Sequence, residues 1–400
     1  MSNDMQRKEI FLERAHYMCP NMYFGITIEL AKTNDAERLN ETIQKLKSAH
    51  PLLSMIVDES VAYKYSEDVN IPVIQGEDYQ SMLNDYENVT KNGWDIRKEG
   101  MLKLVTYAHD DRTIVIFVAH HLLSDGKALL DLAMQFADIY VNDADAEKYQ
   151  DRIIESSDEF AKDLKLPFMV RCIINSANKK WRAKGDRVSY EKYRRFEEEF
   201  SKKVSVHRSI SSMEPDALSD IYDKCKVAGV TVNDYLIASM MIEDNIDNVL
   251  IGANIRKYYK EYEPGSLGNY SSAYSVKIRK STDDVWKLVT IVSKAVKKIR
   301  SDSRKELLTL ALYNAMEPEL LDAAAISVLG DFKSEAGLFV GDRMLGFRIR
   351  ENHTITNLGK IESDIIEDAY FIPPFSPSAK KMAGVITING KLNTVTLTAD

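Results

Sequence analysis

Cysteine is scarce in this sequence. Only Cys19, Cys172 and Cys225 occur among 400 residues, far apart and odd in number. This spacing supports neither a disulfide framework nor a metal site built on cysteine pairs. We therefore expect reduced thiols with structural roles.

Long hydrophobic runs are also missing. No apolar stretch approaches the ~18–20 residues that a membrane-spanning helix needs. The start, MSNDMQRKEIF, carries charges of both signs and lacks the apolar core of a secretory signal. The composition, 44% hydrophobic and 28% charged, is typical of a globular chain. We expect a cytoplasmic protein that is not transmembrane.

An excess of positive charge is absent as well. The formal net charge is −8, whereas a nucleic-acid-binding protein needs a basic surface. One basic stretch, NKKWRAKGDR over 178–187, fits a solvated face or a linker better than a polyanion site. We therefore expect no nucleic-acid partner.

The length and the order of the expected elements indicate two domains. A chain of 400 residues exceeds what one ordinary core accommodates. Hydrophobic spacing predicts a strand over 22–30, a helix over 35–53 and a strand hairpin over 102–121 that turns at Asp110 and Asp111. From about residue 141 to 200 the chain is polar and has few strand-like positions. We predict one domain over 1–165, a linker over 166–200 and a second domain over 201–400.

The last third of the chain is rich in strand patterns. Asn389-Gly390 separates two of them and is the strongest hairpin signal, because both residues tolerate positive φ. The strand–helix order that follows residue 200 is like that of the first half. The expected fold class is α/β (α+β), with mixed sheets and helices.

The stretch VIFVAHHLLSDGKALL, over 115–130, joins an apolar segment to a helical pattern. Its first part is nearly all β-branched or apolar and predicts a strand buried on both faces. Side chains on a strand alternate in direction, so His120 and His121 should point opposite ways. They cannot easily converge with Asp125 on one metal ion, and we expect no metal site.

Two interpretations of these residues stay open. In the first, one histidine is a satisfied core residue, Asp125 caps the helix that begins at Lys127, and Gly126 permits a tight entry. In the second, the strand end holds one imidazole rigidly in a cleft, where histidine is well matched to proton transfer near neutral pH.

HHLLSDG, over 120–126, resembles the HHxxxDG motif of the thioester-dependent acyltransferase superfamily. That superfamily includes chloramphenicol acetyltransferase, nonribosomal peptide condensation domains, wax ester synthases and alcohol acetyltransferases. Further segments are similar in the same order along the chain: 39–57, 228–241, 254–278 and TNLGKI over 356–361, the last in the alcohol acetyltransferase branch. The resemblance covers nearly the full chain. It implies two chloramphenicol acetyltransferase-like lobes, each a mixed β-sheet with helices, arranged in a V around a tunnel.

The resemblance also implies roles for the motif residues. His121 would be the general base that takes a proton from a hydroxyl or amine as it attacks a thioester carbonyl directly, without an acyl-enzyme. His120 would point away and pack. Asp125 would hold the loop by pairing with an arginine. Gly126 would let the donor approach the backbone, and its amide would help stabilise the oxyanion.

One departure concerns the partner of Asp125. Many condensation domains carry an arginine directly after their HPLL-like stretch, but this chain has Ser54 there. Arg256 is therefore the candidate partner. Three candidates for lining the substrate site are Asn269, Ser272 and Asn357, each of which also fits a turn or a strand surface. Five nearby tyrosines are expected to pack or to form a rim: Tyr258, Tyr259, Tyr262, Tyr270 and Tyr274.

The implied function is a stand-alone acyltransferase that moves an acyl group from a thioester to a hydroxyl or amine. No cofactor would be bound permanently; coenzyme A or a phosphopantetheine thioester would be the acyl donor, the latter on a separate acyl or peptidyl carrier protein. One alternative is a non-catalytic condensation-like module that binds a carrier protein or an acyl ligand. Another is epimerisation or dehydration with the same base. We expect a monomer, because the two lobes already supply the cleft.

Overall fold

Two large mixed sheets and one small sheet organise the computed structural model, which describes residues 7–11, 13–91, 94–162, 164–279 and 282–399. The five-stranded sheet has the order β12 (Ile366–Ile372), β2 (Tyr23–Leu30), β7 (Arg112–His120), β6 (Leu102–His109), β5 (Val73–Gln75). The six-stranded sheet has the order β10 (Ser271–Lys277), β9 (Asn248–Asn254), β11 (Asn352–Ile361), β13 (Ala379–Ile388), β14 (Lys391–Ala399), β8 (Val206–Met213). The small sheet has the order β1 (Arg7–Glu9), β4 (Ala62–Tyr65), β3 (Met55–Val57).

Both large sheets combine parallel and antiparallel neighbours. In the five-stranded sheet β5 and β6 are parallel and the other pairs are antiparallel. In the six-stranded sheet β11 runs parallel to both β9 and β13, while the outer pairs are antiparallel. The predicted α/β class with mixed sheets is confirmed.

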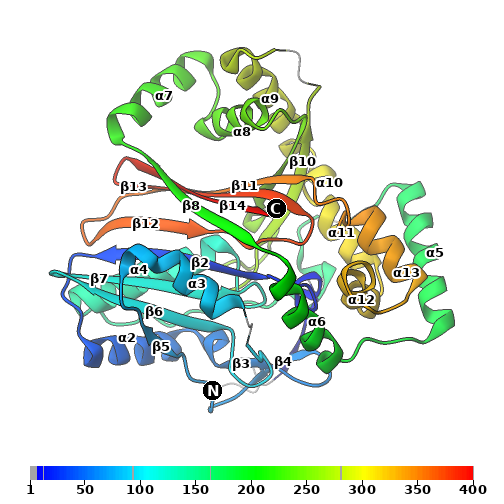
Figure 1. Ribbon diagram of the computed structural model, residues 1–400, viewed down its shortest axis with the longest axis horizontal. Coiled ribbons are helices and arrows are strands. Elements are labelled where there is room, and N and C mark those ends of the chain that lie inside the picture. The colour runs from blue at the N-terminus through cyan, green and yellow to red at the C-terminus, as the bar shows by residue number, and fades with distance from the viewer. Residues whose placement is uncertain (1–6, 12, 92–93, 163, 280–281, 400) are drawn as a thin grey trace.

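Helices surround the two sheets, which lie one above the other in Figure 1. The first half contributes α1 (Arg14–Tyr17), α2 (Ala36–Ala49), α3 (Met82–Lys91), α4 (Gly126–Asn142), α5 (Phe168–Lys184) and short 3₁₀ turns η2 (Pro51–Ser54), η3 (Tyr79–Ser81) and η4 (Ser157–Glu159). The second half contributes α6 (Tyr190–Lys203), α7 (Pro215–Ala228), α8 (Val232–Glu243), η5 (Arg256–Tyr258), α9 (Val285–Arg300), α10 (Ser303–Glu306), α11 (Leu308–Ala315), α12 (Pro318–Leu329), α13 (Glu335–Leu338) and the π-helical η6 (Phe339–Met344).

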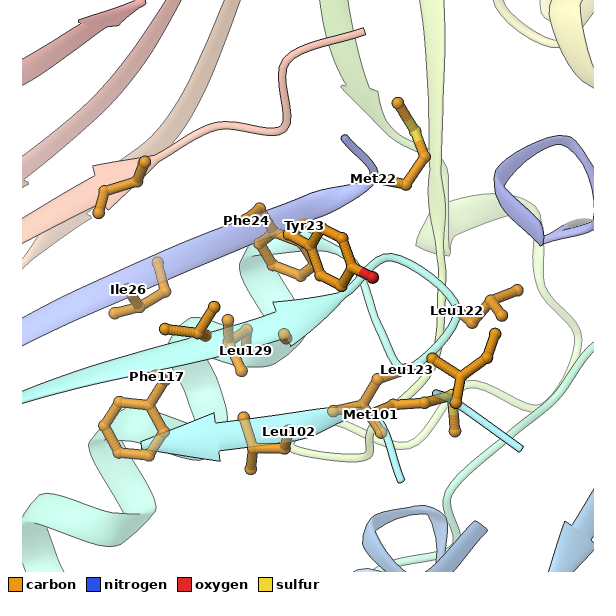
Figure 2. Close-up of a cluster of buried hydrophobic side chains, with 14 of the residues drawn as sticks. Met22, Tyr23, Phe24, Ile26, Met101, Leu102, Phe117, Leu122, Leu123 and Leu129 are labelled. Carbon is orange, nitrogen blue, oxygen red and sulfur yellow. The ribbon is translucent and has the colours of Figure 1, made fainter. Parts of the chain in front are cut away.

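The main apolar core lies beneath the histidine motif. Figure 2 shows side chains of β2, β6, β7 and the loop after β7 packed together, among them Phe24, Leu102, Phe117 and Leu123. The same cluster continues into strands of the other sheet, where Ile386 is fully buried. The motif is therefore supported by a closely packed core, and such a core holds side chains in fixed rotamers.

Several elements lie where the sequence predicts them. β2 matches the expected strand, and β6 and β7 form the expected hairpin, with Asp110 at φ 52° in its turn. Asn389 and Gly390 join β13 to β14 with φ of 49° and 81°. Residues 35–53 fold as α2 followed by η2, because Pro51 starts a new turn instead of continuing the helix.

Residues 166–200, which we expected to link two domains, fold mostly as α5 and α6. The buried face of α6 is aromatic, with Tyr193, Phe196 and Phe200 at helical spacing. This spacing is an amphipathic helix signal within a very polar stretch. The composition of the stretch alone does not reveal this helix, because its charged residues outnumber its buried ones.

Strand β12 crosses the predicted domain division. It comes from the last third of the chain but pairs with β2 in the five-stranded sheet. Asn393 of β14 donates to the carbonyl oxygen of Ala369 in β12 at 2.9 Å, which ties the two sheets together. The boundaries at residues 165 and 200 stay a prediction.

Among the described residues, no helix combines the length and the apolar character that a bilayer-crossing segment requires.

Candidate active site

The histidine motif occupies the loop between β7 and α4. Asp125 is the N-cap of α4, and its Oδ1 accepts hydrogen bonds from the backbone N–H groups of Lys127 at 2.9 Å and Ala128 at 3.0 Å. A carboxylate at this position also suits the positive end of the helix dipole. The capping role that the first interpretation gave to Asp125 is confirmed.

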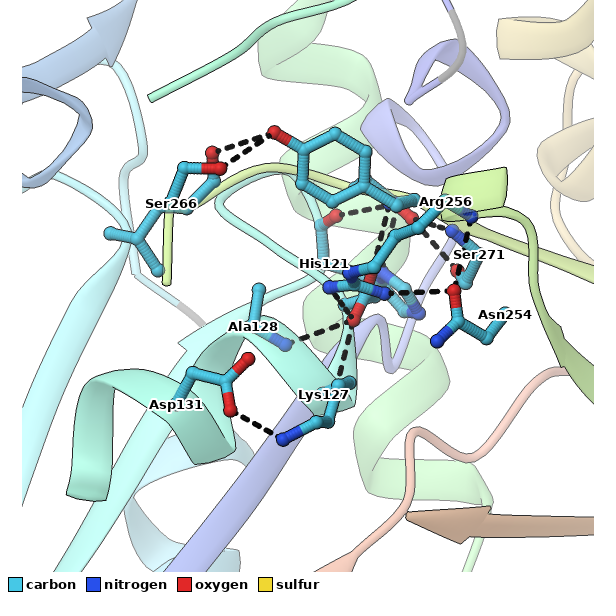
Figure 3. A network of polar contacts seen from close by, with 12 residues as sticks. His121, Lys127, Ala128, Asp131, Asn254, Arg256, Ser266 and Ser271 are labelled. Carbon is cyan, nitrogen blue, oxygen red and sulfur yellow. Dashed lines mark hydrogen bonds and ion pairs between the residues drawn. The ribbon is translucent and has the colours of Figure 1, made fainter. Parts of the chain in front are cut away.

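Asp125 also binds the second half of the chain. Arg256 donates from Nη2 to Oδ1 at 3.1 Å, and the backbone N–H of Tyr270 donates to Oδ2 at 2.7 Å. Asp125 is only 3% exposed, and these contacts are part of the network in Figure 3. Arg256, the candidate partner, therefore pairs with Asp125, and the carboxylate joins the loop after β7 to the segment before β10.

His120 and His121 have different surroundings. His120 is buried, its ring meets Tyr23 edge-on at 5.1 Å between centroids, and its Nδ1 accepts from the backbone N–H of Leu122 at 3.2 Å. Burial lowers the pKa of His120 to about 3, so this ring is neutral. His121 is only partly buried and lines a pocket.

The pocket beside His121 has a volume of about 300 Å³ and lies between the two large sheets. Its wall contains every candidate site residue of the sequence analysis except His120: His121, Asp125, Gly126, Arg256, Asn269, Ser272 and Asn357. Apolar side chains, including Phe24, Leu310 and Met382, supply much of the remaining surface. Such a combination of apolar surface with convergent polar groups is typical of small-ligand sites.

The side-chain amide of Asn269 lies against His121. Its Nδ2 lies 3.2 Å from Nδ1 of His121 and 3.4 Å from the carbonyl oxygen of the same residue. The amide is oriented by Ser271, whose backbone N–H and hydroxyl both donate to the Oδ1 of Asn269, at 3.2 and 2.7 Å. Asn269 therefore presents its NH₂ group to His121.

His16, which the sequence analysis did not single out, lies against the same ring. The His16 and His121 rings are stacked, with centroids 4.3 Å apart and an interplanar angle of 9°. Burial and the two neighbouring histidines lower the pKa of His16 well below its usual range. Burial also lowers the pKa of His121, opposed by hydrogen bonds to the backbone carbonyls of His121 and Ser124 and by the charge of Asp125. The pair is therefore neutral at physiological pH.

The other predicted residues hold ordinary local positions in the wall. A Cβ on Gly126 would meet Leu358 and Phe371 side-chain atoms at 3.1 Å, so here protein side chains approach the backbone closely. Ser272 donates to the carbonyl oxygen of Glu306 at 3.4 Å. Asn357 accepts from the backbone N–H of Gly359 at 2.8 Å.

No metal cluster is evident in the described part of the chain, and two of the three thiols are buried. No group of three or more histidine, cysteine, aspartate or glutamate side chains there could hold a metal ion. Cys19 and Cys225 are buried and Cys172 is exposed. Burial raises the pKa of Cys19 to about 12, which keeps that thiol protonated.

A larger cavity lies next to the site. Its volume is about 1010 Å³, and Tyr270, whose N–H binds Asp125, forms part of its wall. Asn269 faces the smaller pocket instead. Adjacent residues of one segment thus border two cavities. The larger one carries more acidic than basic side chains: Glu67, Asp151, Glu155, Asp158, Glu159 and Glu261 against Lys8, Arg152 and Lys260.

No protein-family model and no curated protein matches the sequence. Solved structures are similar in fold. The chain superimposes on the trichothecene 15-O-acetyltransferase TRI3 of Fusarium sporotrichioides with a TM-score of 0.64 and 10% identity, covering 100% of this chain and 92% of that one.

Two domains of peptide synthetases are also similar. The first condensation domain of the CDA synthetase gives a TM-score of 0.58 at 12% identity, with 100% and 91% of the two chains covered. The epimerization domain from the third module of tyrocidine synthetase B gives 0.56 at 12% identity, with 98% and 92% covered. The chain therefore has the two-lobed fold of condensation-type domains over its full length.

Proposed function

We propose that this protein is an acyltransferase that moves an acyl group from a thioester to a hydroxyl or amine, with His121 as the general base. One observation carries the proposal: a neutral imidazole borders a pocket between the two sheets, with fixed neighbours on both sides. A base with these properties can accept a proton from an incoming nucleophile.

The reaction would proceed by direct attack. The acceptor oxygen or nitrogen forms a bond to the thioester carbonyl carbon as its proton moves to His121. The tetrahedral intermediate then collapses, the carbon–sulfur bond breaks, and the imidazolium returns the proton to the leaving thiolate. No covalent enzyme intermediate is needed, because binding both substrates side by side supplies much of the rate enhancement.

The proposal requires one tautomer of His121. The hydrogen must reside on Nδ1, so that Nε2 is the unprotonated atom. In this tautomer Asn269 donates to the carbonyl oxygen of His121, 3.4 Å from its Nδ2. Hydrogen bonding at one ring nitrogen generally sets the role of the other.

Asp125 would not take part in proton transfer. Both of its carboxylate oxygens accept hydrogen bonds, from Lys127, Ala128, Arg256 and Tyr270. Its role would be to hold the loop that carries His121. His16 would keep the base dry and oriented through the ring stack.

Two cavities border the segment 269–270, which supports room for two substrates. The smaller, largely apolar pocket would take the acyl group. The donor would be coenzyme A or a phosphopantetheine arm on a separate carrier protein. The structural relatives include an acetyltransferase and condensation domains, and this supports a thioester donor.

The test is thiol release from acyl-CoA and from pantetheine thioesters in the presence of a panel of alcohols and amines. We expect acceptor-dependent release that falls at least 100-fold in His121→Ala. His207→Ala, on the exposed face of β8, is the matched control and should retain full activity. Unchanged turnover in His121→Ala would remove His121 as the base. Thioester binding without release by the native protein would favour the non-catalytic module.

A further inference from the structure

Helix α5 exposes apolar side chains on its outward face. Phe168 and Met169 in its first turn are 70% and 75% exposed, and Ile173 one turn later is 45% exposed. Cys172 beside them is also exposed. Side chains this exposed project from the surface, and contiguous apolar patches of this kind mark interaction sites.

The second half of the same helix is basic. From Phe168 to Lys184 the sequence contains Arg171, Lys179, Lys180, Arg182 and Lys184 and no acidic residue, although the whole chain has a net charge of −8. Lys179 and Lys180 follow Phe168 and Met169 by eleven residues, about three helical turns. The exposed lysines therefore project from the same side as the apolar residues.

The inward face of α5 attaches the helix to the protein, together with an ion pair between Arg182 and Glu317 at 2.8 Å. Ile174, Ala177 and Trp181 are buried, and the Asn178 side chain donates to the carbonyl oxygen of Ala315 at 2.8 Å. Figure 1 shows α5 at the edge of the molecule, beside α13. Because the outward residues do not pack against the rest of the protein, their apolar character requires another explanation.

We propose that the outward face of α5 docks on an anionic lipid surface. Phe168, Met169 and Ile173 would insert among the headgroups and acyl chains, and Lys179 and Lys180 would bind the lipid phosphates. A basic helix with an apolar patch binds membranes through both contributions together. Phe168, Met169 and Ile173 are exposed, and the lysines complement the charge of an anionic lipid surface, which favours a fluid lipid surface over a structured protein partner.

Docking here would bring lipid close to the site. α5 packs against α11, and Thr309, Leu310 and Tyr313 of α11 line the pocket beside His121. The proposal stands on the surface of α5 and does not depend on acyl transfer by His121.

The test is sedimentation of the full chain with vesicles of neutral phosphatidylcholine and with vesicles containing 30% phosphatidylserine. We expect binding to the anionic vesicles that weakens as salt increases. Phe168→Glu/Met169→Glu and Lys179→Glu/Lys180→Glu should each weaken it at least tenfold. Val227→Glu, at the 90% exposed position of α7, and Lys202→Glu/Lys203→Glu in α6 are controls of matched chemistry and should bind as the native protein does.

Cys172 provides an independent readout, because Cys19 and Cys225 are buried. An environment-sensitive fluorophore on Cys172 should shift to the blue with anionic vesicles and not with neutral ones. Equal binding by the control and α5 variants, or no shift at Cys172, would overturn the proposal. So would capture of an acidic acyl carrier protein through Lys179 and Lys180 with no binding to vesicles.

Discussion

The ring of His16 lies flat on the ring of His121, with centroids 4.3 Å apart and planes 9° from parallel. His16 belongs to the four-residue helix α1, near the start of the chain, and His121 follows β7. Two imidazoles at this separation cannot both be protonated at low cost, since like charges in a poorly solvated site repel strongly. The stack therefore favours neutral imidazole rings.

Removing the stacked ring should change the titration of His121. In His16→Ala water can reach the exposed face of His121, so we expect its lowered pKa to rise towards the ordinary value of 6.5. A base must be unprotonated, so the acidic limb of kcat/KM should move up in pH with it. We also expect kcat to fall about tenfold, because the ring loses its fixed orientation. Ring NMR signals of His121, assigned with His121→Gln, measure the pKa without reference to turnover.

His16→Phe is the matched variant for this experiment. It retains a flat aromatic ring over His121 and should restore the native pKa and most of kcat. If Phe behaves like Ala, the nitrogen atoms of His16 matter rather than its ring. If neither variant moves the titration of His121, the stack has no positioning role.

Asn269→Asp should raise the pKa of His121. The replacement has the same shape and can still accept from Ser271, but it places a carboxylate near Nδ1, where Asn269 Nδ2 now lies at 3.2 Å. A negative charge beside the ring favours its protonated form and fixes the Nδ1–H tautomer. The expected result is an acidic limb at higher pH with kcat preserved on the plateau. A pH–rate profile that coincides with that of the native protein would contradict this arrangement.

Asp125→Ala should destabilise the protein far more than it alters the chemistry. The change leaves Arg256, 9% exposed, without its carboxylate partner and removes the N-cap of α4. Loss of one partner of a buried pair costs about 3–5 kcal/mol. Denaturant unfolding measures the loss. Asp131→Ala, which removes a partner of Lys127 from the more exposed pair on the same helix, should cost less than about 1 kcal/mol. Similar losses in both variants would contradict the structural role of Asp125.

The parts of the site formed by local sequence could be predicted. A β-branched run specifies the strand that ends at His120, and Asp125 followed by Gly126 specifies the start of α4. The opposite surroundings of His120 and His121 follow from the strand period. Arg256 was chosen as the partner of Asp125 because the expected arginine position holds Ser54, a choice that rests on the resemblance and not on spacing.

The parts of the site formed by distant segments could not be predicted. Nothing in the sequence near His16 distinguishes it from a surface histidine, because its stack with His121 depends on how α1 packs. Arg14 fixes that packing through Asp322 of α12, with Nε to Oδ1 at 2.8 Å. The pairing of β12 with β2 is likewise set by contacts between segments that are distant in the sequence, because β12 could join either of the two large sheets. Local patterns specify elements, whereas tertiary packing selects their partners.

Glu13→Gln should stabilise the protein increasingly as the pH rises from 4.5 to 8. Glu13 is 1% exposed, and burial raises its pKa to about 8 from an ordinary 4.5, with Glu159 contributing in the same direction. Tyr63 and Tyr259 also face it. Between pH 4.5 and 8 the folded state therefore holds a proton that the unfolded state has released, so stability falls as pH rises through this window. Such a shift corresponds to about 4–5 kcal/mol.

The variant should therefore match the native protein near pH 4, where Glu13 is protonated in both states, and exceed its Tm progressively up to pH 8. Above pH 8 the folded native protein also ionises, so the difference should level off. Glu199→Gln, an exposed carboxylate on α6, is the control and should show no such trend. A constant difference between Glu13→Gln and the native protein from pH 4 to 8 would mean that Glu13 is ionised in the folded state, with a partner for its buried Oε2.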